Sequence, residues 1–304
     1  MKFLVLGGTA LTGPHVIRQL VGHQVTTLSR NKRQIITEKT VKGDRLFTSN
    51  IERALISSDP DVVIDMVPFT VDGARALVDA FAEWGKQVPV VALSSIDVYA
   101  SYARIHNTEQ FGQQITPARE DAQLRTQLGA EGAAYDKIGI ERLYQDTLED
   151  LTTIRAPVVY GWPDGTRIAS YFEPMLEGKT SIEIAQDLMS FRISRSLHKN
   201  VAHAICLAAQ ARPKGHAVFN VAEPPQYSEL EWAQRIARLA GWEGSFEPGP
   251  NYWPHEPEQD VTADSTAIRD ALGYTEIYDP EEGLRDALAF WSHHRSGWVY
   301  QKGY

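Results

Sequence analysis

The chain of 304 residues contains a single cysteine, Cys206. One cysteine cannot form an intramolecular disulfide, and a cysteine-based metal site would lack its usual ligand pairs. Cys206 lies in an apolar stretch, so we expect it to pack in the core. The histidines do not have the spacing of a helical metal pair, because His198 and His203 are five residues apart and His293 and His294 are adjacent. The sequence therefore predicts no metal site.

Long apolar runs and positive charge are also scarce. No run approaches the roughly 18 residues of a membrane span, and Phe3 to Leu6 is too short for the hydrophobic region of a signal peptide. We therefore expect a cytoplasmic protein that makes no membrane contact. The 30 Lys and Arg residues against 39 Asp and Glu give a formal net charge of −9. This balance weighs against nucleic-acid binding, which needs clustered cations, although it leaves room for a local basic pocket.

Residues 2–33 are the most informative stretch, because they read as strand, glycine-rich turn, helix, strand and basic cluster. The apolar run 2–6 is bounded by Gly7 and Gly8, and residues 14–21 carry apolar side chains at helical spacing. A parallel β-α-β unit with the turn at the start of the helix follows from this order. Unpaired N–H groups at a helix N-terminus favour a pyrophosphate, and glycines let the backbone approach it closely.

Strand-like and helix-like segments alternate along the chain. Apolar runs rich in β-branched residues occur at 24–28, 62–67, 88–93, 152–159 and 217–221, and segments with helical periodicity at 71–84, 131–148, 199–209, 228–240, 262–272 and 280–293. This alternation predicts an α/β fold, a Rossmann-type doubly wound parallel sheet. Residues 102–132 lack sustained periodicity and are expected to form a long excursion over the carboxyl edge of the sheet.

The pattern also suggests a division into two parts. We expect residues 1–165 to form a Rossmann domain that binds NAD(P) and is completed by about 198–222. The rest of 166–304, namely about 166–197 and 223–304, has shorter helices and irregular pieces. These segments are expected to form a smaller, mixed C-terminal lobe that binds substrate.

Several motifs in order resemble one enzyme family. Gly7-x-x-Ala10-x-x-Gly13 resembles the Gly-x-x-Gly-x-x-Gly turn of short-chain dehydrogenase/reductases, with alanine in the middle position. Further similarities are GDR at 43–45, DVVIDMVPF at 61–69, SSIDVYA at 94–100, IRAPVVYG at 154–161, FNVAEP at 219–224 and ADSTAIRDALGY at 263–274. The series spans nearly the whole chain. It resembles the extended, or atypical, short-chain dehydrogenase/reductases, a family similar to NAD-dependent epimerases and dehydratases that act on nucleotide sugars.

The resemblance implies a dinucleotide cofactor. Enzymes of this class that use NAD commonly have Asp or Glu after the second strand, whereas this chain has Ser29 and Arg30, followed by Asn31, Lys32 and Arg33. Arginine clamps a phosphate bidentately, so we predict NADP(H), with NAD as the alternative. The implied cofactor contacts are Gly7, Thr9, Ala10, Leu11, Thr12, Gly13, Ser29, Arg30, Arg33, Asp44, Met66, Val67, Pro68, Ser94, Lys137 and Pro157.

The resemblance implies that catalysis uses the tyrosine and lysine of a Tyr-x-x-x-Lys helix together with a hydroxyl residue. The hydroxyl residue aligns with Ser95 in this chain. The tyrosine is where the pattern breaks. Either Tyr135 is the acid and glycine takes the lysine position, or Lys137 is the family lysine and Ala133 takes the tyrosine position. Glu141, four residues after Lys137, favours the second alignment.

Helix geometry then limits the role of Tyr135. Residues two apart on a helix point roughly 200° from one another, so Tyr135 cannot simply replace a tyrosine at 133. Two routes stay open. The helix begins near Asp136 and leaves Tyr135 on a loop that reaches the site, or the 102–130 excursion supplies another acid. Arg155, Arg167, Arg192 and Arg195 lie where the family often has phosphate-binding arginines, or they form structural salt bridges.

Two functions are consistent with these residues. The first is an NADP(H)-binding oxidoreductase or epimerase acting on a small hydroxyl or carbonyl compound, such as a sugar or nucleotide sugar. In it Ser95 orients the substrate oxygen, Lys137 holds the nicotinamide ribose and Tyr135 moves the proton. The alternative is an atypical member without the catalytic tyrosine, acting as a dinucleotide-binding regulator or an RNA-binding protein. The resemblance also implies a homodimer through the helices at 71–84 and 131–148.

Overall fold

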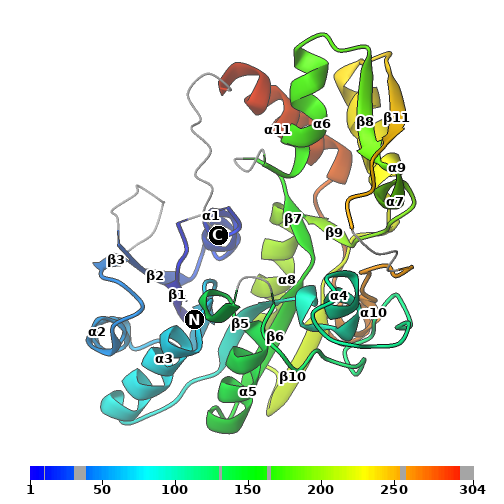
Figure 1. Cartoon of the computed structure of the whole chain (residues 1–304). Coiled ribbons are helices and arrows are strands. Elements are labelled where there is room, and N and C mark those ends of the chain that lie inside the picture. Colours follow the sequence, from blue (N-terminus) through cyan, green and yellow to red (C-terminus); the bar gives the residue numbers. More distant parts are fainter. Residues whose placement is uncertain (10, 31–38, 130–131, 163–165, 254–257, 295–304) are drawn as a thin grey trace.

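A seven-stranded, fully parallel sheet forms the centre of the computed structural model, which describes residues 1–304 except 10, 31–38, 130–131, 163–165, 254–257 and 295–304. The strand order is β10-β6-β5-β4-β1-β2-β3 (Figure 1). The strands are β1 (Lys2–Leu6), β2 (Gln24–Ser29), β3 (Lys39–Lys42), β4 (Val62–Asp65), β5 (Val90–Ser95), β6 (Leu151–Ala156) and β10 (His216–Asn220). This order confirms the predicted doubly wound parallel sheet.

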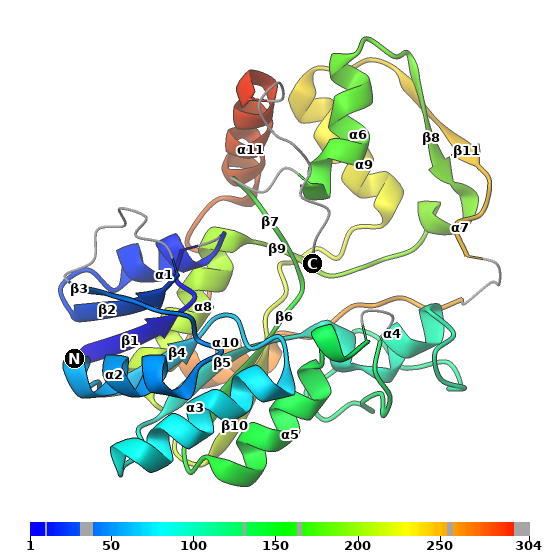
Figure 2. The ribbon, with the colours of Figure 1, turned by 60° about the vertical axis from the view of Figure 1, so that its left-hand side comes forward.

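Helices cover both faces of the sheet and bury two apolar cores. On one face lie α1 (Gly13–Gln19), α8 (His198–Ala211) and α10 (Thr266–Leu272). On the other lie α2 (Thr48–Ser58), α3 (Val71–Trp84) and α5 (Lys137–Thr147), side by side in Figure 2. Because both faces are covered, the strands are apolar almost throughout rather than alternating, which is what made them readable as runs.

Helix α3 shows how local signals fixed the predicted bounds. The side chain of Thr70 accepts a hydrogen bond from the N–H of Gly73 at 3.0 Å and so caps the first turn. Leu77 and Phe81, four residues apart, are buried against the sheet. The helix ends at Gly85, which has the left-handed conformation.

The predicted strand at 152–159 is divided in two. Pro157 separates β6 from β7 (Val158–Tyr160), because proline has no N–H to continue the ladder. Strand β7 leaves the main sheet and pairs in parallel with β9 (Arg195–Leu197). The chain thereby passes from the sheet into the second group of elements.

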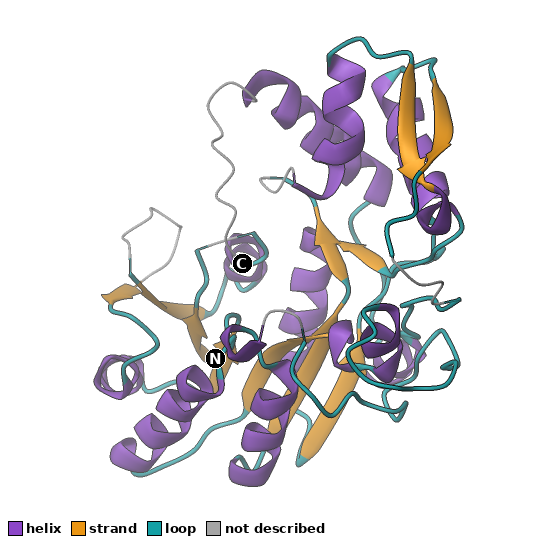
Figure 3. Ribbon diagram, in the orientation of Figure 1, coloured by secondary structure: helices purple, strands orange, loops and turns teal. Residues whose placement is uncertain are grey.

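This second group lies beyond the carboxyl ends of the strands (Figure 3). It comprises α6 (Thr166–Leu176), β8 (Ser181–Ala185), α7 (Gln186–Met189), α9 (Glu229–Ala240), β11 (Ser245–Gly249) and α11 (Pro280–His294). These helices share a core that includes Phe172, Trp232 and Trp291, and β8 pairs in parallel with β11. The division of the chain into a Rossmann domain (1–165 and about 198–222) and a smaller lobe (about 166–197 and 223–304) stays a prediction.

The excursion from the carboxyl edge begins with a short helix, α4 (Ala100–Ile105). Two backbone hydrogen bonds then fasten it. The N–H of Ala118 donates to the carbonyl of Thr262 at 2.7 Å, and that of Arg125 donates to the carbonyl of Val98 at 2.9 Å. The second bond holds the end of the excursion against the segment that follows β5, so residues far apart in the sequence are in contact there.

A buried histidine pair joins α1 to α8. The Nε2 atoms of His15 and His198 are 2.9 Å apart, and Nδ1 of His198 is 3.0 Å from the carbonyl oxygen of Tyr160. Because a carbonyl only accepts, Nδ1 of His198 carries hydrogen, and in the neutral pair its Nε2 accepts from Nε2–H of His15. No helix in the described part of the chain is long and apolar enough to cross a membrane.

Candidate functional site

The glycine turn after β1 lies at the carboxyl edge of the sheet beside the end of β4. Leu6 is in register with Leu28 of β2 and Asp65 of β4, so Gly7, Ser29 and Met66 follow at one edge. Gly7 has a φ of +82°, and a Cβ there would lie 2.3 Å from Cγ2 of Val67. Only glycine fits this conformation and this contact.

The end of the turn sets α1 close against the strand. A Cβ on Gly13 would lie 2.5 Å from the carbonyl carbon of Gly8, so the two backbones touch directly. Leu11 has a φ of +36°, and the side chain of Thr12 makes no capping hydrogen bond. Helix α1 has only seven residues. Its helix dipole is correspondingly weak. The close approach of the Gly13 backbone to that of Gly8 is therefore the more distinctive feature of the turn. Ala10 lies outside the described residues.

The corner after β2 holds the residues predicted to choose the cofactor. Ser29 is buried and Arg30 is exposed, whereas Arg33 lies outside the described residues. The N–H of Gly43 donates to the carbonyl of Ser29 at 3.0 Å, which brings Asp44 to the same corner. The Asp44 carboxylate accepts the N–H of Leu46 at 3.1 Å. An exposed cation and a half-buried carboxylate therefore flank the end of the strand.

A buried charge cluster of Asp65, Arg45 and Tyr144, which was not predicted from the sequence, holds the end of β4 in place. Asp65 has no solvent exposure, and its carboxylate accepts hydrogen bonds from Arg45 at 2.6 Å and from the hydroxyl of Tyr144 at 2.7 Å. Its second oxygen lies 3.4 Å from the N–H of Val67. The backbone that continues to Val67 and Pro68 is thus held by charge-assisted bonds.

Lys137 points into this edge from the start of α5. Its side chain is 3% exposed, and Nζ donates to the carbonyl oxygens of Pro68 at 2.8 Å and Leu93 at 3.1 Å. Nζ also lies 4.9 Å from the ring centre of Phe69 and 5.1 Å from that of Tyr135. Burial lowers the pKa of Lys137 to about 8, although the carboxylates of Asp97 and Asp65 oppose the shift. The lysine links β4, β5 and Tyr135.

The helix predicted for 131–148 begins later than expected. Helix α5 starts at Lys137, and residues 132–134 form a single 3-10 turn. Asp136 caps α5, since its carboxylate accepts the N–H of Gly139 at 2.8 Å and its own backbone is non-helical. The helix limit of 131 is therefore corrected to 137. Ala133 is exposed, and Tyr135 lies on the loop before the helix, as in the first of the two open routes.

Tyr135 lies near Ser95 and Asp97, and both side chains affect its pKa. Burial raises the pKa of Tyr135 well above its usual value, and the neighbouring Asp97 carboxylate raises it further. Burial also raises the pKa of Asp97, and the positive charge of Arg125 acts in the opposite direction and lowers it. Arg125 is 1% exposed; its Nε donates to the carbonyl of Asp97 at 2.8 Å, and its Nη2 lies 3.8 Å from Asp97 Oδ1.

Asp97 and Arg125 were not predicted as site residues. They meet because the excursion returns to the loop after β5, and no spacing in the sequence encodes that return. The one available signal was a carboxylate two residues after Ser95.

Ser94 points into a separate buried network. Its hydroxyl donates to Glu141 at 2.5 Å, and Arg155 binds the same carboxylate at 2.8 and 3.1 Å. Arg155 also donates to the hydroxyl of Tyr99 at 3.0 Å. A cofactor contact by Ser94 stays a prediction, as does one by Pro157, which is buried after β6.

The predicted arginines are mostly engaged by carboxylates. Arg155 pairs with Glu141, Arg192 with Glu231, and Arg195 with Glu229, whereas Arg167 is exposed. Among the described residues, no group of three or more His, Cys, Asp or Glu side chains is placed to hold a metal ion.

No protein-family model matches the chain, and no curated protein matches its sequence. Solved structures match over the full length. UDP-glucose-4-epimerase from Stenotrophomonas maltophila, with bound NAD and formylated UDP-arabinopyranose, is 20% identical with a TM-score of 0.78, covering 97% of this chain and 99% of its own. UDP-glucose 4-epimerase from Thermotoga maritima, with UDP-glucose, is 18% identical with a TM-score of 0.74, covering 97% and 100%.

A dehydratase matches equally well. The dTDP-glucose 4,6-dehydratase from Bacillus anthracis in complex with NAD is 15% identical with a TM-score of 0.75, covering 98% of each chain. The predicted resemblance is thus confirmed at the level of the fold. The chain has the fold of the NAD-dependent epimerases and dehydratases of the extended short-chain dehydrogenase/reductase type.

Proposed function

We propose that this protein is an NADP(H)-dependent oxidoreductase or epimerase that acts on a hydroxyl or carbonyl group of a small, sugar-like compound. The observation that carries the proposal is the convergence of Ser95, Tyr135 and Lys137 at the carboxyl edge of the sheet, beside the glycine turn. In open α/β sheets this edge is where ligands bind. The epimerase and dehydratase structures with the same fold contain NAD.

The residues at the edge fit a dinucleotide. At Gly7, Gly8 and Gly13 the turn leaves no space for an added side chain, and Val67 and Pro68 follow at the end of the neighbouring strand β4. Arg30 supplies an exposed cation for a 2′-phosphate at the end of β2. When bound, the nicotinamide supplies or accepts the hydride. Lys137 holds the ribose through its ammonium group.

Tyr135 is the group placed to donate the proton. Burial and Asp97 raise its pKa, so its phenol is a weaker acid than a free tyrosine, but it carries its proton at neutral pH and gives it to a carbonyl oxygen that is being reduced. Ser95 holds the same oxygen through its hydroxyl. In the opposite direction Tyr135 accepts the substrate proton as it passes its own to Asp97, a carboxylate whose burial makes it more basic.

Two measurements test the proposal. NADPH oxidation, followed at 340 nm with a panel of aldoses, ketoses and simple aldehydes, should fall about 10²- to 10⁴-fold in kcat for Tyr135→Phe. Tyr278→Phe, which removes a hydroxyl outside the group of Ser95, Tyr135 and Lys137, should leave kcat unchanged. Calorimetric titration should show tighter binding of NADP than of NAD, and Arg30→Ala should remove the difference. Tighter binding of NAD by the unaltered protein would contradict the cofactor assignment.

The second candidate is a dinucleotide-binding regulator without turnover. It is favoured by one observation: the position aligned with the family tyrosine is an exposed alanine, Ala133, and the pKa of Tyr135 is raised rather than lowered. Tight cofactor binding together with no turnover across the panel would support it. RNA retardation on a gel at physiological salt would distinguish the RNA-binding form of this alternative.

A further inference from the structure

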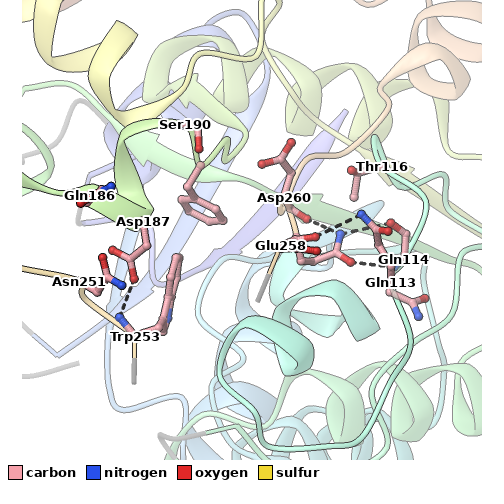
Figure 4. Close-up of a pocket in the computed structure, with 12 residues that line it drawn as sticks. Gln113, Gln114, Thr116, Gln186, Asp187, Ser190, Asn251, Trp253, Glu258 and Asp260 are labelled. Atoms are coloured by element: carbon pink, nitrogen blue, oxygen red, sulfur yellow. Dashed lines mark hydrogen bonds between the residues drawn. The ribbon is translucent and has the colours of Figure 1, made fainter. Parts of the chain in front are cut away.

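A cavity of about 710 Å³ lies between the excursion, helix α7 and the segments 251–253 and 258–260. Figure 4 shows Asp187, Asn251 and Trp253 on one side of it and Gln113 and Gln114 on the other. We call it the amide-lined cavity. Its volume falls within the usual range for small-molecule sites.

The lining is polar but contains no cation among its described residues. Five amide side chains contribute, together with two hydroxyls, two aromatic rings and three carboxylates. The amides are Gln113, Gln114, Gln186, Asn251 and Gln259, and the carboxylates are Asp187, Glu258 and Asp260. Amides both donate and accept hydrogen bonds, as sugar hydroxyls do.

The aromatic wall of the cavity belongs to an apolar cluster that extends to the segment after Ser95. Phe191 and Trp253 pack edge to face, with ring centres 5.1 Å apart. Both belong to the same apolar cluster as Ile96 and Val98, which directly follow Ser95 along the chain. The aromatic wall of the cavity therefore belongs to the same apolar cluster as the segment that follows the candidate catalytic hydroxyl.

The negative charge of the cavity is offset only in part, by the electrostatic interaction of Asp260 with Arg192. The two oxygens of Asp187 accept the backbone N–H groups of Tyr252 and Trp253, each at 2.8 Å, and that leaves the charge itself in place. Asp260 accepts the backbone N–H of Arg192, but the guanidinium of Arg192 binds Glu231 and the carbonyl of Gln226. A phosphorylated ligand would meet three carboxylates, and the described residues that line the cavity include no Lys or Arg.

We infer that the amide-lined cavity binds an uncharged, unphosphorylated sugar and discriminates against nucleotide sugars and sugar phosphates. This inference rests on the proposed function, since it names the substrate class of that site. It also separates this chain from the UDP-glucose and dTDP-glucose enzymes that share its fold. The amides of Gln186 and Asn251 bind the hydroxyls, the indole of Trp253 packs on a sugar face, and the carboxylates repel phosphate. The side-chain N–H groups of Gln113, Gln114 and Gln259 already donate to backbone carbonyls.

Saturation-transfer NMR on the full chain tests the inference. The probes are neutral aldohexoses and aldopentoses, glucose 1-phosphate and UDP-glucose, at constant ionic strength, with and without NADPH. We expect signal from at least one neutral sugar, and binding at least about tenfold weaker for its 1-phosphate. Gln186→Ala and Asn251→Ala, both at exposed positions, should each weaken the neutral sugar several-fold. Gln24→Ala, at the far end of the sheet, is the matched control.

Glu258→Gln isolates the charge effect, because the exposed side chain keeps its shape and loses one negative charge. It should narrow the preference for the neutral sugar over its 1-phosphate by several-fold. The inference is overturned if no neutral sugar binds, or if UDP-glucose binds more tightly and Glu258→Gln leaves the ratio unchanged. NADPH binding is titrated in the same samples. Sugar binding without NADPH binding would refute the proposed function alone, and the reverse would refute this inference alone.

Discussion

The His15–His198 pair makes the stability of the protein depend on pH in a defined direction. Burial lowers the pKa of His15 from 6.5 to about 4, and the neighbouring His198 adds to the shift. Below pH 6.5 the unfolded chain therefore binds a proton at His15 that the folded chain refuses. The stability that His15 contributes is complete above this pH and is lost as the pH falls toward 4.

The size of the effect follows from the shift. One pKa unit corresponds to about 1.4 kcal/mol, so the full loss is about 3 kcal/mol in the free energy of unfolding. Because the folded form begins to take up the proton only near pH 4, about 2 kcal/mol of this is already lost at pH 5. A loss of this size is a large share of the 5 to 15 kcal/mol typical of a folded protein.

Urea unfolding at pH 7.5 and pH 5.0 measures the loss for the unaltered chain and for His15→Gln, whose amide still donates to His198. The difference between the two pH values should be smaller by about 2 kcal/mol in the variant. Gln19→Ala is the control. Gln19 lies on α1, as His15 does, and its side chain donates to the carbonyl of Lys199 on α8 at 3.0 Å, so the substitution removes a bond between the same two helices without removing a titratable group. It should lower stability equally at both pH values. An equal pH dependence in the unaltered chain and His15→Gln would refute the reasoning.

Three further predictions concern the turn, the buried ion pair and the cysteine. Gly13→Ala places a methyl group 2.5 Å from the Gly8 carbonyl carbon, so it should lower Tm by several degrees and weaken cofactor binding in calorimetry. Glu141→Gln leaves the Arg155 charge buried without its partner and should cost about 3–5 kcal/mol in urea unfolding, with a loss below 1 kcal/mol contradicting the pairing. Burial raises the pKa of the Cys206 thiol to about 12. Iodoacetamide at pH 8 should therefore leave the folded chain unlabelled and label it once urea unfolds it, as mass spectrometry would show.

The sequence predicted those elements whose signals are local. Helix α3 carries its cap, its buried stripe and its terminal glycine within its own residues, and its bounds were predicted correctly. Strand β3 was missed, because Lys39–Lys42 has one apolar residue and lies at the edge of the sheet, where little is buried. Helix α2 was missed as well, since its first turn follows Phe47 and has no capping side chain.

The candidate site divides in the same way. Gly7, Ser95 and Lys137 were recognisable, because each belongs to a short motif whose spacing is fixed by one turn, strand or helix. Asp97 and Arg125 were not, because their contact depends on where a loop of more than twenty residues returns. Contacts of this kind depend on tertiary packing and leave no period in the sequence.

Tyr135 shows how one capping residue changes the meaning of a spacing. Within a continuous helix, residues 135 and 137 would diverge, but Asp136 caps α5, and its non-helical backbone leaves Tyr135 outside the helix. The N–H of Asp136 donates to the carbonyl of Phe69 at 2.9 Å, and the rings of Phe69 and Tyr135 lie 5.9 Å apart. Tyr135 is therefore held by the segment after β4, whose Pro68 carbonyl also binds Lys137. Because Val67 and Pro68 line the proposed cofactor edge, the proposed proton donor Tyr135 is held by the same segment that would contact the cofactor, and α5 contributes only its first residue, Lys137.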